Sequence, residues 1–207
     1  MLRPTYLNRT IRTAALLFIS FGIAIPAWAG SLHDAAKNGD VAQIKILVGQ
    51  DVDINAKGKN DATPLLVAAL AGRRDVVELL IDQGADISAS NKGGLTPLHA
   101  AAYNGHEDVV EFLITKSADI DDQRNRFGVT PLHAAAEENH LEVVKLLIAK
   151  GANLSLEEAN GPYTALTRAG YREHWDIVNL LIMHGAECQP VDIVGEWLFD
   201  ECTRRKN

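Results

Sequence analysis

The segment Thr96-Pro97-Leu98-His99-Ala100-Ala101-Ala102 recurs further along the chain as Thr130-Pro131-Leu132-His133-Ala134-Ala135-Ala136. Weaker copies flank this pair, one beginning with Thr63-Pro64-Leu65 and the other with Thr164-Ala165-Leu166. The four starts are evenly spaced, and a period of about 33 residues indicates supersecondary units stacked in a row rather than one globular core. The spacing therefore predicts a repeat architecture, which narrows the function toward recognition more than toward chemistry.

Each copy is followed by an aliphatic cluster with the i, i+3, i+4 spacing of a helix face. The clusters occupy residues 76–81, 109–114, 143–148 and 177–182. Threonine stands where a helix N-cap belongs, and proline follows at the first helical position, where its missing N–H costs nothing. One unit is therefore predicted to be a helix, a short turn, a second helix and a long polar loop. Glu173 stands in the turn that has Gly72 and Gly105 in earlier units, and we expect that turn to be altered.

A fifth, degenerate copy opens the array, because residues 32–39 match residues 98–105 while the Thr-Pro pair is missing. End repeats are expected to be atypical, since one face meets water. The predicted fold class is all-α, a solenoid of about five helix-turn-helix repeats followed by a C-terminal capping helix. We place the array at residues 30–189 and the cap and tail at residues 190–207. The repeats span approximately residues 30–59, 60–91, 92–125, 126–159 and 160–189.

With several positions in register across five units, the chain resembles the ankyrin repeat family, whose signature is a period of about 33 residues with the motif T-P-L-H-x-A. The resemblance covers roughly residues 31–189. It implies an L-shaped stack of helix pairs whose loops project as fingers. It also implies a protein that binds other proteins through the fingers and the concave inner helices. Members of the family are rarely enzymes, so we expect no enzymatic activity.

Six of the seven histidines recur with the period, and a residue that recurs with the fold serves the fold. The resemblance implies that one slot holds a structural histidine bonded near the threonine and that the other closes the inter-helix turn. The first slot contains His33, His99 and His133, and the second contains His106, His140 and His174. The sequence has no metal-binding, nucleophile or phosphate-loop motif, so we expect no metal, no cofactor and no catalytic residue.

Residues 1–29 have the pattern of a cleavable secretory signal peptide, with three arginines, no acid, an apolar run and an A-x-A end at Ala29. The alternative is an uncleaved N-terminal anchor, although the apolar run is shorter than the ~20 residues of a membrane span. After cleavage we expect no stable membrane span. The short signal favours the bacterial periplasm, and secretion, including eukaryotic secretion, is the alternative location.

The charge balance makes two classes of partner unfavourable. The chain has 20 basic and 27 acidic residues, and removing Arg3, Arg9 and Arg12 with the signal leaves 17 against 27, a formal net charge of −10. Apart from residues 204–206 no basic tract remains, so nucleic acid and anionic membrane surfaces are poor partners. A basic protein partner is allowed but not required. We expect a monomer that binds another protein.

The two cysteines, Cys188 and Cys202, lie close together in a chain that looks exported, and exported proteins meet an oxidising compartment. Between them, apolar residues recur at helical spacing at Ile193, Val194, Trp197 and Leu198. This spacing predicts a short capping helix folded back on repeat five. Our hypothesis is a disulfide that staples the cap. Two free or buried thiols are the alternative, because a sequence does not supply the geometry that a disulfide requires.

In the ankyrin pattern, residues before the inter-helix turn face the groove, and aromatic residues and arginine are enriched among binding hot spots. The predicted interface is a row of Leu70, Tyr103 and Tyr171 with two arginines beside it. The alternative is ordinary surface, since isolated exposed aromatic residues are common. The full set of predicted protein-binding residues is Leu70, Tyr103, Asn104, Phe127, Glu137, Glu138, Arg168, Tyr171 and Arg172.

The expected function is that of a protein-binding scaffold or adaptor in an exported compartment. One alternative is a secreted effector or inhibitor that acts on a host or enzyme target, and another is a non-catalytic subunit of an enzyme complex. A non-periodic cluster of polar residues would favour an enzyme, and the sequence has none. The identity of the partner does not follow from the fold, because repeat surfaces are general platforms.

Overall fold

Eleven α-helices and one 3-10 turn, η1 (Lys59–Asp61), make up the secondary structure that the computed structural model describes, in residues 31–50 and 52–206. No β-strand is present in those residues, which confirms the predicted all-α class. The first ten helices form five pairs, and α12 (Val191–Lys206) follows them. The pairs are α2 (Leu32–Asn38) with α3 (Val41–Val48), α4 (Pro64–Leu70) with α5 (Arg74–Asp82), α6 (Pro97–Tyr103) with α7 (Glu107–Thr115), α8 (Pro131–Glu137) with α9 (Leu141–Ala149), and α10 (Ala165–Tyr171) with α11 (Trp175–Met183). The predicted signal peptide, residues 1–29, lies outside the described residues.

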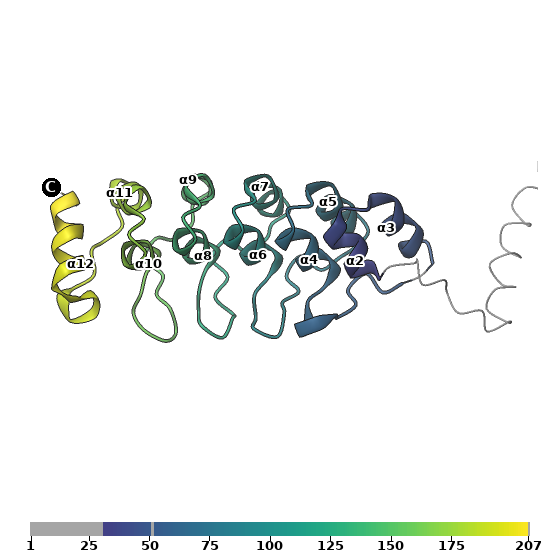
Figure 1. Cartoon of the computed structure of the whole chain (residues 1–207), viewed down its shortest axis with the longest axis horizontal. Helices are drawn as coiled ribbons and strands as arrows, with labels where there is room; N and C mark the ends of the chain where they lie inside the picture. The colour runs from purple at the N-terminus through teal and green to yellow at the C-terminus, as the bar shows by residue number, and fades with distance from the viewer. Residues whose placement is uncertain (1–30, 51, 207) are drawn as a thin grey trace, which may run out of the picture. The chain divides into compact units, whose positions relative to one another are not determined.

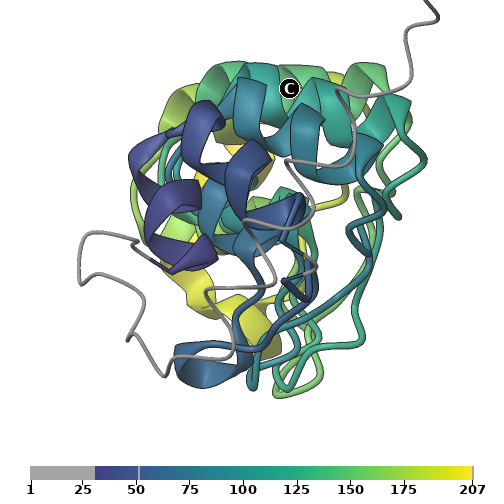
Figure 2. The ribbon, with the colours of Figure 1, turned by 90° about the vertical axis from the view of Figure 1, so that its right-hand side faces the viewer.

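The pairs stack side by side in chain order, and α12 covers the end of the stack (Figure 1). The first helix of each pair lies in an inner row and the second in an outer row, with contacts to the same row of the next repeat. Seen along the stack, successive repeats lie behind one another and their loops gather on one side (Figure 2). We call these loops fingers one to four: residues 49–63, 83–96, 116–130 and 150–164.

The core lies between the two rows and repeats with the sequence. Leu65, Leu98 and Leu132, each two residues after a threonine, are at most 1% exposed. Alanines at the ends of the inner helices are fully buried, which lets neighbouring inner helices approach closely: Ala36, Ala69, Ala102 and Ala136. Each buried leucine contributes roughly 1.5–3 kcal/mol relative to an exposed one. The stability of the array is therefore approximately a sum over repeats and their interfaces.

Threonine caps begin the inner helices, as the sequence predicts. The Oγ1 atoms of Thr63, Thr130 and Thr164 accept hydrogen bonds from the backbone N–H three residues later, at 3.3, 3.3 and 3.4 Å. At Thr96 the hydroxyl lies 2.8 Å from Nδ1 of His99, and the backbone N–H of Thr96 donates to the same nitrogen at 3.3 Å. Replacing such a cap by alanine costs about 1 kcal/mol.

The turn between the two helices of a pair keeps one conformation in all five repeats, so the expectation of an altered turn at Glu173 is wrong. Glu173 has φ 60°, close to the 65° of Gly72 and the 72° of Gly105. The N–H of the next residue, His174, donates to a carbonyl of the preceding helix at 2.9 Å, as its counterpart His106 does at 3.0 Å. These shared bonds hold Glu173 in the left-handed region, at a cost of roughly 1–2 kcal/mol for a side chain there.

The periodic histidines bond each repeat to its neighbours. First-slot Nε2 atoms donate forward to the finger before the next threonine: His33 to Ala62 O at 2.9 Å, His99 to Val129 O at 2.9 Å and His133 to Tyr163 O at 3.1 Å. Second-slot Nε2 atoms donate backward to the end of the previous inner helix: His106 to Leu70 O at 3.1 Å, His140 to Tyr103 O at 2.8 Å and His174 to Glu137 O at 2.9 Å. Burial lowers the pKa of His99 and of His133, which favours neutral rings.

The capping helix α12 is present but interrupted. Gly195 has φ 78° and ψ 160°, outside the helical region, which glycine adopts at no steric cost. The side chains buried under the cap are Val194, Leu198 and Cys202. Trp197, which the spacing placed on the apolar face, is exposed, and its ring meets Trp175 edge to face with 5.8 Å between centroids. The buried stripe of Val194, Leu198 and Cys202 keeps an i, i+4 spacing, and Trp197 lies beside this stripe rather than in it.

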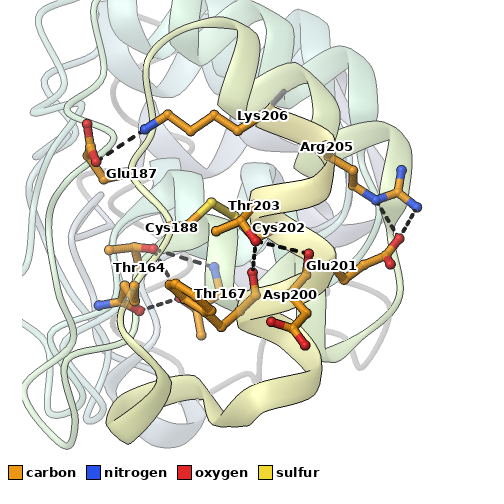
Figure 3. Close-up of a disulfide and its surroundings, with 12 residues drawn as sticks. Thr164, Thr167, Glu187, Cys188, Asp200, Glu201, Cys202, Thr203, Arg205 and Lys206 are labelled. Atoms are coloured by element: carbon orange, nitrogen blue, oxygen red, sulfur yellow. Dashed lines mark hydrogen bonds and ion pairs between the residues drawn. A yellow bond between two sulfur atoms is a disulfide. The ribbon is translucent and has the colours of Figure 1, made fainter.

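A disulfide joins Cys188, in the loop after α11, to Cys202 of α12, with 5.9 Å between the Cα atoms (Figure 3). One turn beyond Cys202, Nζ of Lys206 lies 3.4 Å from the carboxylate of Glu187 (Figure 3). Thr167 occupies the first histidine slot of repeat five, and its buried hydroxyl donates to the side chain of Gln189. The connection from α11 to α12 thus replaces the finger of a sixth repeat.

Candidate functional site

An apolar groove of about 480 Å³ lies between the inner helices α4, α6 and α8 and fingers two and three. Its apolar lining includes Leu66, Leu70, Leu95, Tyr103, Phe127 and Val129. Each inner helix contributes a residue because the repeat places equivalent positions side by side. The groove is therefore a direct product of the period, while its apolar character is a property of these particular residues.

Three large apolar side chains of the groove are about half exposed: Leu70 at 46%, Tyr103 at 50% and Phe127 at 48%. Leu70 and Tyr103 occupy the same slot, seven residues after the threonine cap, at the ends of α4 and α6. Phe127 comes from the tip of finger three, which faces the helices across the groove. Aromatic side chains grouped in this way on a concave surface are typical binding hot spots.

Arg168 lines the groove, but its guanidinium is already engaged. Both of its arms bind the carboxylate of Glu158, at 2.5 Å each, and a third contact reaches Glu137 at 3.9 Å. The Glu158 side chain is buried, so this ion pair fixes finger four to α10. The hydrogen bond and the charge of Glu158 raise the pKa of Arg168. Arg168 therefore holds finger four in position.

The remaining predicted residues lie beside the groove lining rather than in it. Arg172 binds the carboxylate of Glu137 at 2.6 Å, and the Asn104 amide donates to the carbonyl of Ala100 at 3.1 Å. Tyr171 meets the ring of Tyr163 edge to face, with 5.9 Å between centroids. The residues that the structure brings together in the groove are Leu70, Tyr103, Phe127, Glu137 and Arg168, and those outside its lining are Asn104, Glu138, Tyr171 and Arg172.

Seven lining residues were absent from the predicted set, and the large aliphatic ones among them are Leu66, Leu95 and Val129. Leu66 stands in the histidine slot of repeat two, so its departure from the period was a signal that the sequence offered. Leu95 and Val129 immediately precede the caps Thr96 and Thr130, and nothing in their spacing distinguishes them from ordinary finger residues.

The described part of the chain offers neither a metal site nor a membrane-spanning helix. No group of three or more His, Cys, Asp or Glu side chains is placed there to hold a metal ion. Among the same residues, no helix has both the length and the apolar character to cross a membrane. The groove is thus the feature on which a functional proposal can rest.

The stacked helix pairs, the projecting fingers and the open groove define a helical repeat protein. The family model for ankyrin repeats (3 copies) matches residues 32–124 and 116–192, which is more than half of the chain. The chain therefore belongs to the ankyrin repeat family. Comparison with curated proteins gave no match. Ankyrin repeats are in general protein-interaction scaffolds and are typically non-catalytic.

Proposed function

We propose that this protein is a binding scaffold or adaptor for another protein, working as a monomer in an exported compartment, the bacterial periplasm. The observation that supports it best is the clustering of half-exposed Leu70, Tyr103 and Phe127 along one apolar groove. The helix caps and the periodic histidines make hydrogen bonds that hold the repeats together, and these three side chains take no part in them. A folding role does not account for their exposure, whereas burial under a partner does.

Two features support the exported compartment. The N-terminal pattern of residues 1–29 is that of a signal peptide, and disulfides such as Cys188–Cys202 persist in oxidising compartments. Cell fractionation followed by intact-mass measurement tests this part. We expect a periplasmic protein whose first residue is Gly30. A chain that keeps Met1 and stays with the cytoplasm would exclude export, and release into the medium would favour secretion.

A pair of double variants tests the groove. Tyr103→Ala with Phe127→Ala removes exposed apolar surface inside the groove. Ile46→Ala with Met183→Ala removes it elsewhere, since these side chains are 55% and 80% exposed and lie outside the lining. Affinity capture from the native compartment, quantified by mass spectrometry, should show proteins lost with the groove variant and kept with the control. A hot-spot loss of more than ~1 kcal/mol corresponds to at least about fivefold. Equal capture by both variants would remove the groove from consideration.

A further inference from the structure

Basic residues occupy the tips of the first three fingers. Lys59, Lys92 and Arg126 are exposed there, one on each finger. Backbone hydrogen bonds tie consecutive tips together: the N–H of Lys92 donates to Asn60 O at 2.7 Å, and the N–H of Arg126 donates to Gly93 O at 3.0 Å. These bonds between neighbouring backbones place the three residues on consecutive finger tips, and we call these residues the basic row.

The tip cations differ from most of those on the outer side of the stack. There, basic side chains have acidic partners: Arg74 with Glu78, Lys116 with Asp82, Lys145 with Glu142, and Lys150 with Glu111. In the described residues, no ion pair involves Lys59, Lys92 or Arg126. The basic row thus consists of three cations without an ion pair in that part of the chain, and the formal net charge of the whole chain is −7.

Two members of the basic row, Lys92 and Arg126, border the apolar groove. Asn91 and Phe127 line the groove and are the chain neighbours of Lys92 and Arg126. The guanidinium carbon of Arg126 lies 5.6 Å from the centroid of the Phe127 ring, within cation–π range. A partner seated on Phe127 would thus meet positive charge at the same tip.

Except for Asp61, the acidic side chains described on the finger side of the protein lie away from the tips that carry the basic row, or are bonded to other groups. Glu157 lies on finger four, beyond the basic row, and Glu137 is held by Arg172 at 2.6 Å. Asp61, beside Lys59, is the carboxylate closest in sequence to the row. The other carboxylates that the structure describes in fingers one to three accept hydrogen bonds from backbone N–H groups of the fingers: Asp53, Asp86, Asp119, Asp121 and Asp122. Carboxylates of a partner would therefore meet the three tip cations, and charge placed in this way sets orientation and association rate.

We propose that the groove receives a segment of a protein partner that combines apolar and acidic side chains. The apolar side chains of this segment pack against Leu70, Tyr103 and Phe127. Its carboxylates lie over Lys59, Lys92 and Arg126. This inference rests on the proposed function and names the chemistry of the partner. The groove supplies the buried apolar contact, and the row of cations selects segments that are acidic along one edge. Charges at the rim of an interface act mainly on specificity and association rate.

Selection from a display library of random short peptides on the full-length chain tests the proposal, followed by titration of the enriched peptides. The charge-reversed variant is Lys59→Glu, Lys92→Glu and Arg126→Glu. The matched control is Lys45→Glu, Arg74→Glu and Lys145→Glu, which makes the same charge change on the outer helices α3, α5 and α9. We expect peptides that combine apolar residues with Asp or Glu. The charge-reversed variant should bind these peptides about tenfold or more weakly at low salt, while the control variant changes their affinity less than about twofold.

Other outcomes separate the two proposals. Peptides that depend on Tyr103 and Phe127, yet have no acidic excess and bind the tip-reversed chain equally, would overturn this inference and leave the proposed function standing. Selection without any groove-dependent peptide would count against both. A labelled oligothymidine that binds through the same three cations would replace the protein segment by a nucleic acid, and this too would overturn the inference.

Discussion

Gly170 of α10 packs directly against Leu198 of α12. A Cβ atom built on Gly170 would lie 2.5 Å from Cδ1 of Leu198, closer than side chains pack. The equivalent residue in earlier repeats is alanine, at Ala69, Ala102 and Ala136, where the neighbour is another inner helix. Repeat five therefore has glycine in place of alanine at this position, which leaves room for Leu198 of the cap.

The substitution Gly170→Ala should lower the free energy of unfolding, although replacing glycine by alanine in a helix usually raises it. In an unobstructed helix, alanine is more stable than glycine by roughly 0.5–1 kcal/mol. Here the methyl group overpacks the interface, which typically costs about 1–3 kcal/mol. Urea unfolding followed by tryptophan fluorescence is the measurement, because Trp175 and Trp197 both lie at the cap. Repeating the substitution in a Leu198→Ala background should make alanine stabilising, and a gain of stability in the native background would contradict the packing described.

Loss of the disulfide should loosen the cap. The bond closes a loop with a sequence separation of 14, and the chain-entropy model gives about 3 kcal/mol for such a loop. Cys188→Ser with Cys202→Ser should lower the urea midpoint reported by Trp175 and Trp197. Non-reducing mass spectrometry after alkylation provides the direct check. Two alkylated thiols in protein taken from an oxidising compartment would show that the bond does not form there.

Acid should destabilise the array through its buried histidines. Desolvation lowers the pKa of His99 and of His133 below the ordinary value of 6.5. The unfolded chain therefore binds more protons than the folded chain in that window, and stability falls as the pH drops from about 6.5 toward the folded-state pKa. The slope approaches about 1.4 kcal/mol per pH unit for each such group.

The control for this pH effect is an exposed histidine. Replacing His99 and His133 by glutamine should flatten the dependence of the unfolding free energy on pH between neutral and mildly acidic conditions. The matched control replaces His184 by glutamine; this residue is exposed, and its ring contacts the carbonyl of Leu180 at 2.9 Å. An unchanged slope in the double variant would show that these rings do not govern acid stability.

Breaking the Arg168–Glu158 pair should release finger four. Arg168→Ala leaves the buried carboxylate of Glu158 without its bidentate partner, at a cost of about 1–3 kcal/mol. Hydrogen exchange should then speed up at Glu158 and Ala159, whose N–H groups bond to Tyr163 O and Phe127 O. Arg168→Lys should not restore protection, because an ammonium cannot bind both carboxylate oxygens in the same fork. Full protection in Arg168→Ala would mean that the finger is held by its backbone alone.

The period of the sequence predicted most of the fold, because each repeated residue has one local task. Thr63 and Thr130 cap helices, Pro97 starts one, and His133 donates a hydrogen bond to the next finger. Each of these roles follows from the residue's position within the repeat. The structure of the C-terminal cap was predicted less accurately from the sequence than the repeats were. Gly195 interrupts α12 at a position outside the repeats, where no periodic signature is available to predict the backbone.

The candidate site was predicted in part for a similar reason. Leu70 and Tyr103 share a periodic slot, so their exposure followed from the pattern. The pairing of Arg168 with Glu158 did not, since Glu158 lies in finger four and reaches α10 through the path of that loop. Finger contacts between different repeats depend on loop geometry, and that geometry is absent from residue spacing.

The central claim is that a protein partner sits in the groove, and site-specific photo-crosslinking tests it most directly. A photoreactive amino acid would replace Tyr103 in one protein and Met183, which is exposed outside the groove, in another. After irradiation of the native compartment, our account predicts a covalent protein adduct at position 103 and none of that mass at position 183. Adducts of equal yield at both positions, or an adduct at position 183 alone, would contradict it.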